Sequence, residues 1–130
     1  MGLRFLKISV VYLVLGALLG FGMGIAQSFA LVPVHAHLVL LGWASMALAG
    51  LVYHFYPAAS ITRLARWHFW LHNIGLPIFM VSLLLLRAGV EGAETFVRIG
   101  GGVTFVGLAL FAINLMRTLT AAKRVTAHAQ

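Results

Sequence analysis

The sequence predicts an all-α membrane protein with four transmembrane helices in an antiparallel bundle. Of its 130 residues, 62% are hydrophobic and 8% are charged, whereas a soluble domain is roughly half apolar and about a quarter charged. Four apolar segments are each long enough to cross a hydrocarbon core, which takes about 20 helical residues. Turn or polar residues separate these segments, and the length leaves room for one domain.

The first predicted helix covers about residues 8–27. It is longer than the apolar region of a usual signal peptide and three more apolar spans follow it, so we interpret it as a retained helix. Gly16, Gly20 and Gly24 recur every four residues along it. This pattern favours close packing against another helix, either within the bundle or between protomers.

The second and third predicted helices cover about residues 33–56 and 67–88. Pro33 suits the first turn of a helix, where its missing N–H is not needed. Pro57 is expected to end the second helix. Pro77 falls inside the third helix, where it should kink the backbone or loosen one turn.

The fourth predicted helix covers about residues 97–118 and completes a single domain of residues 1–118. Asn114, near its end, is expected to form a hydrogen bond across the bundle. Residues 119–130 are predicted to be a polar cytoplasmic tail.

The basic residues indicate how the bundle is oriented. Seven of the nine Lys and Arg residues fall on one side of the predicted spans: Arg4, Lys7, Arg63, Arg66, Arg117, Lys123 and Arg124. The other side holds Arg87, Arg98, Glu91 and Glu94. By the positive-inside rule, both termini are cytoplasmic, in a membrane of the bacterial inner-membrane type. The basic residues flank the apolar segments, where we expect them to contact the lipid bilayer. They form no stripe along a helix, so we expect no nucleic-acid partner.

Two histidines lie at the outer start of the second helix. His35 and His37 are candidates for function because ionisable residues inside a bilayer usually serve one, and no Asp, Glu or Lys lies at depth. Their separation corresponds to about 200° around an α-helix, so they point to opposite sides and cannot easily bind one metal ion together. The alternative is that both bond water or lipid phosphate near the headgroups.

A second group of histidines lies toward the cytoplasmic side. His68 and His72 are four residues apart and share a helix face. With His54 they form a possible site for copper or zinc. The alternative is structural, with His68 in the interfacial aromatic belt and His72 bonded to Asn73. The chain has no cysteine, which excludes thiolate metal sites and covalent haem attachment.

Two stretches of these helices are "HAHLVLLGWASMALAGLVYHFYP" and "LARWHFWLHNIGLPIFM". In this order they resemble the haem–copper oxidase subunit I superfamily. In that family, a His-X-His helix ends in a His-aromatic-aromatic-Pro stretch, and the next helix opens with His-Phe and Ile-Gly. The similarity covers about residues 31–80, and the Gly-rich first helix is similar to that of short subunit I-like proteins.

The resemblance implies a b-type haem. Carried over, His35 matches the ligand of the high-spin, gas-reacting haem and His37 matches a ligand of the low-spin haem. His54 and His68 match residues that are not metal ligands in the large enzymes. His72 has no clear counterpart, so it remains an open candidate for cofactor binding.

The chain also departs from the family. It lacks the family's three copper ligands and its tyrosine crosslink motif. Apart from the pair His35 and His37, it has no further histidine on the outer side. We therefore do not expect a proton-pumping oxidase from this chain alone. A haem with two axial histidines therefore needs a second ligand from elsewhere. A homo-oligomer with haem between protomers would supply it. The glycine face of the first helix offers a contact surface for such an oligomer.

The predicted function is a small integral-membrane b-type haem protein for electron transfer or for binding NO or O₂. Whether it is an enzyme stays open; a haem-dependent oxidoreductase is the class it would belong to. The sequence indicates no redox partner. The alternatives are a copper- or zinc-binding membrane protein and a cofactor-free structural or assembly subunit.

Overall fold

The structure is a computed structural model that describes residues 1–127, and the side chains of residues 1–120. The part of the chain it describes is helical and contains no strand. The elements are α1 (Gly2–Ala26), α2 (Val32–His37), the π-helix η1 (Leu38–Ala44), α3 (Ser45–Phe55), α4 (Pro57–Ser60), α5 (Arg63–Arg87) and α6 (Ala93–Ala127).

Within the residues that the structure describes, four helices are long and apolar enough to cross a membrane. They are α1, α5, α6 and the continuous span Val32–Phe55, which consists of α2, η1 and α3. This confirms the predicted fold class. Three of the four begin between four and six residues before the predicted starts. Apolar length marks only the part of a helix inside the bilayer, and a helix can continue beyond it.

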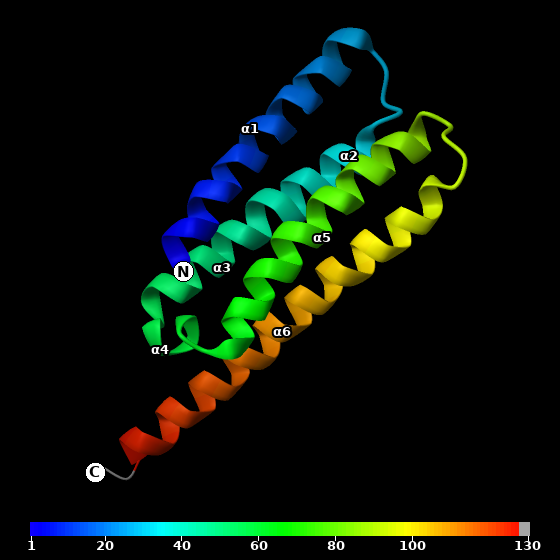
Figure 1. The fold of residues 1–130 in the computed structure, drawn as a ribbon. Helices are drawn as coiled ribbons and strands as arrows, with labels where there is room; N and C mark the ends of the chain where they lie inside the picture. Colours follow the sequence, from blue (N-terminus) through cyan, green and yellow to red (C-terminus); the bar gives the residue numbers. More distant parts are fainter. Residues whose placement is uncertain (128–130) are drawn as a thin grey trace.

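The helices run alternately up and down (Figure 1). One end of the bundle holds Met1, α4 and the later turns of α6, and we call it the terminal end. The other, distal end holds the loops 27–31 and 88–92. α1 packs along η1 and α3, and α5 packs along α6; contacts of α5 with α2 and η1 join the two pairs.

The helix boundaries at the prolines and at the predicted tail agree only in part with the expectation. Pro33 lies in the first turn of α2. The long second span ends at Phe55, as Pro57 predicts, but Pro57 itself begins the short helix α4. α5 is helical on both sides of Pro77. α6 continues to Ala127, so most of the predicted tail extends the last helix, and residues 128–130 lie outside the described residues.

Polar contacts close the terminal end. The Asn114 side chain, buried on α6, donates from Nδ2 to the carbonyl oxygen of Ala59 at 2.8 Å. The Thr62 hydroxyl donates to Asn114 Oδ1 at 2.9 Å. Thr62 Oγ1 also accepts the backbone N–H of Ala65 at 3.0 Å, which caps α5. The predicted hydrogen bond of Asn114 across the bundle is therefore confirmed.

Candidate functional site

His35 lies between the first two spans, at the distal end. Its Nδ1 is 2.9 Å from the carbonyl oxygen of Gly16 on α1. Its ring rests against Gly20, where an added Cβ would lie only 2.8 Å from His35 Cε1. The absence of a side chain at Gly20 thus makes room for the imidazole.

His37 points to the other side of the same helix. Its Nδ1 is 2.6 Å from the carbonyl oxygen of Pro33, one turn earlier. Its ring meets Phe79 of α5 edge-on, with centroids 4.9 Å apart. The two histidines therefore face different neighbours, α1 and α5, as their spacing predicts.

The hydrogen bonds fix the chemical state of both rings. A carbonyl oxygen can only accept, so Nδ1 carries the proton in His35 and in His37. In the neutral ring, Nε2 then keeps a lone pair. Neither Nε2 has a hydrogen-bond partner in the part of the chain that the structure describes, and both residues are half-buried. This is the usual state of a metal-ligating histidine, whose second nitrogen donates to a backbone carbonyl.

The π-helix η1 follows His37 directly. Such wide turns occur often at functional sites. The backbone here is held from two sides. A Cβ added at Gly42 would lie 2.5 Å from Tyr12 Cγ of α1, and the carbonyl oxygen of Leu41 accepts a hydrogen bond from His72 Nε2 at 3.0 Å. α1 and α5 together therefore hold the π-helix in the middle of this span.

His68 and His72 lie fully buried in the core, with no exposed area. The His68 ring sits between Phe5 and Phe111, at centroid distances of 4.8 Å and 5.0 Å and interplanar angles of 23° and 34°. Its Nδ1 is 3.0 Å from the Tyr53 hydroxyl. His68 thus contacts aromatic rings from α1, α3 and α6, and does not belong to an interfacial belt.

One ring nitrogen of each buried histidine lacks a hydrogen-bond partner among the described residues. These atoms are His68 Nε2 and His72 Nδ1, on rings whose centroids are 5.4 Å apart. His72 does not bond Asn73, which instead donates to the Phe69 carbonyl at 2.7 Å.

The structure does not bring His54, His68 and His72 together. His54 is exposed at the end of α3, with its ring against Phe55. Within the described part of the chain, no group of three or more His, Cys, Asp or Glu side chains is placed to hold a metal ion. The arrangement leaves His68 and His72 as a pair in an aromatic core.

The glycine face of α1 is used within the chain. A Cβ at Gly16 would lie 2.9 Å from Val39 Cγ2, and Gly20 receives His35. Gly24 has open space around it. The expected seam between protomers is therefore largely occupied by the second span of the same chain, because the nearest partner for a small-residue face is the next helix along the sequence.

The sequence pattern does not indicate which residues surround the buried histidines. Phe5 and Phe111 come from opposite ends of the chain, and Tyr53 lies in the aromatic stretch that ends the second span. Their alignment around His68 depends on how the four helices pack. An aromatic residue one or two turns from a span end carries no local sign of this role.

Comparison with known proteins yields a distant relative. The chain is similar to the Cbb3-type cytochrome c oxidase subunit CcoN1 of Stutzerimonas stutzeri. The two are 31% identical over 119 aligned residues, which cover 68% of this chain and 25% of the relative. No family model matches the chain, and no solved structure matches it.

This match supports a haem–copper oxidase subunit I-like relationship over part of the chain. The chain spans about a quarter of the relative's length. With four helices fit to span a bilayer, it also supports a multi-pass bacterial membrane protein.

Proposed function

We propose that this chain is a small b-type haem protein of the bacterial inner membrane, in which His35 or His37 supplies an axial ligand to the iron. The observation that carries the proposal is the state of these two rings. Each has its Nδ1 proton bonded to a backbone carbonyl and its Nε2 unpaired within the described residues. The similarity to a cytochrome c oxidase subunit supports iron as the metal.

The roles of the chain's own residues follow from these contacts. The carbonyls of Gly16 and Pro33 hold the rings of His35 and His37 in one tautomer and one orientation. When bound, haem would supply one-electron redox chemistry with two axial ligands, or NO and O₂ binding with one position open. His35 and His37 face opposite ways, so a haem with two histidine ligands would take the second from another copy of the chain, and for that case we propose a homo-oligomer.

The absorption spectrum of the purified protein tests this proposal. In detergent, after expression in haem-replete cells, we expect a Soret band, and sharp visible bands after reduction with dithionite. His35→Ala and His37→Ala, made separately, should show which residue binds iron through loss or shift of these bands. His54→Ala is the matched control, because His54 is exposed and distant from the proposed site in sequence.

Other results point to other functions. A colourless protein would overturn the haem proposal and favour a cofactor-free structural or assembly subunit. Elemental analysis that finds copper or zinc in that colourless protein would instead support the metal-binding alternative. A haem spectrum unchanged by either histidine substitution would refute the ligand assignment.

A further inference from the structure

The first two turns of α5 carry a basic and aromatic face at the terminal end of the bundle. Arg63, Arg66, Trp67 and Trp70 follow the spacing i, i+3, i+4, i+7, so they lie on one side of the helix. Together they line a hollow of about 250 Å³. Both indoles are largely exposed, at 60% for Trp67 and 59% for Trp70, and both arginines are exposed.

Within the described residues, the two guanidinium groups have no side-chain carboxylate near them. The only acidic residues in the chain are Glu91 and Glu94, and both lie at the distal end, before and in the first turn of α6. The 25 residues of α5 separate Arg63 from that end, which corresponds to about 37 Å of helix, well beyond the screening length in physiological salt. Neither glutamate therefore neutralises this positive charge, which can attract an anion from outside the chain.

We propose that this hollow binds the phosphate of an anionic phospholipid. Guanidinium groups bind phosphate through paired hydrogen bonds, and tryptophan side chains favour the level of the lipid headgroups. Below the hollow, the exposed face of α5 becomes apolar, with Ile74, Ile78 and Val81 in line with Trp70. This surface suits acyl chains, which a free phosphate ion lacks.

Lipid retention measured by native mass spectrometry tests the proposal on the full-length protein. The probes are dioleoylphosphatidylglycerol, dioleoylphosphatidylcholine and inorganic phosphate. We expect the wild-type protein to retain phosphatidylglycerol over phosphatidylcholine. The double variant Arg63→Gln/Arg66→Gln should bind phosphatidylglycerol about thirtyfold more weakly, since each basic residue at a membrane surface contributes roughly fivefold.

A second double variant separates this site from general charge attraction. Arg4→Gln/Arg117→Gln removes the same charge from the same end of the bundle but leaves the hollow intact, and it should retain the lipid. Equal loss in both variants would show diffuse attraction only and overturn the site. Displacement of the lipid by millimolar inorganic phosphate would show that the hollow binds a small anion rather than a lipid, and would overturn the lipid proposal. Gel filtration and circular dichroism identify variants that fail to fold, and Arg63→Lys/Arg66→Lys then serves as the milder substitution.

Discussion

At the scale of single residues, the histidines divide into two kinds. His35 and His37 are half-buried, and each has one nitrogen bonded to a backbone carbonyl. His68 is fully buried, and its hydrogen bond is to the hydroxyl group of Tyr53. A buried polar atom without a partner costs about 1–3 kcal/mol, so the Tyr53–His68 contact should be visible in the stability of the protein.

We expect Tyr53→Phe and His68→Phe each to lower the free energy of unfolding by about 1–3 kcal/mol, because each removes the buried hydrogen bond between the Tyr53 hydroxyl and His68 Nδ1. The double variant should lose less than the sum of the two, by about 1 kcal/mol, because both polar groups are then gone. Denaturant titration in detergent micelles, followed by circular dichroism, measures all four free energies. Strictly additive losses would show that the contact contributes nothing.

At the scale of elements, glycine sets how closely α6 approaches α5. A Cβ at Gly100 would lie 2.5 Å from the backbone nitrogen of Phe79 and 3.0 Å from the carbonyl oxygen of Gly75. These are backbone atoms, which cannot rotate away as a flexible side chain can. Gly102, two residues further along α6, has open space around it.

Gly100→Ala should therefore destabilise the bundle by about 1–3 kcal/mol, since the two helices must move apart. Gly102→Ala is the control: it has the same chemistry and the same gain in helix propensity, up to about 1 kcal/mol, but no clash. Thermal unfolding in the same detergent compares them. Equal melting temperatures for the two variants would contradict the close contact between α5 and α6.

The sequence predicted the number and type of these elements well, since four long apolar runs admit few other solutions. Their starts were predicted less well, because helices continue into the headgroup region where hydropathy falls. The π-helix η1 was not predicted, since Leu38–Ala44 reads locally as ordinary helix. Its wide turn is formed next to neighbouring helices, through Gly42 against Tyr12 and the bond from His72 to Leu41.

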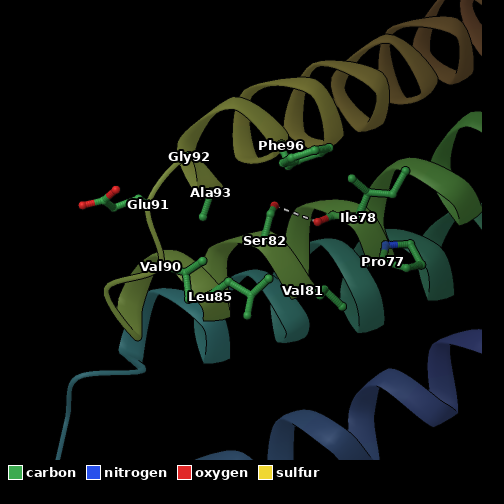
Figure 2. Close-up of a pocket in the computed structure, with 10 residues that line it drawn as sticks. All are labelled: Pro77, Ile78, Val81, Ser82, Leu85, Val90, Glu91, Gly92, Ala93 and Phe96. Atoms are coloured by element: carbon green, nitrogen blue, oxygen red, sulfur yellow. Dashed lines mark hydrogen bonds between the residues drawn. The ribbon is translucent and has the colours of Figure 1, made fainter.

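At the scale of the whole molecule, most of the basic residues lie at the end of the bundle that holds Met1 and the later turns of α6. The start of α1 and the connection through α4 lie there, and the later turns of α6 extend beyond them in the same direction (Figure 1). Toward the opposite end lies an apolar groove between α5 and α6, lined by residues such as Pro77, Leu85 and Phe96 (Figure 2). The charge difference between the two ends determines which one we expect to face the cytoplasm.

A carboxy-terminal fusion tests this orientation. Seven of the nine basic residues lie at the terminal end, which predicts a cytoplasmic carboxy terminus. Green fluorescent protein folds well in the cytoplasm, so its fusion should be fluorescent. Alkaline phosphatase folds well only in the periplasm, so its fusion should be inactive. Phosphatase inserted in the loop 88–92 should be active. The opposite pattern would reverse the orientation and place His35 and His37 near the cytoplasmic side.

The sequence by itself determined the fold class, the four spans and the opposed directions of His35 and His37, because bilayer thickness and helical periodicity act on local stretches of chain. Only the tertiary structure decided which groups these histidines meet. It placed Gly16 and Gly20 against the second span rather than free for a partner, and left His54 apart from the buried pair. Such contacts join residues far apart in sequence, and they depend on how closely and at what rotation each helix packs on its neighbours.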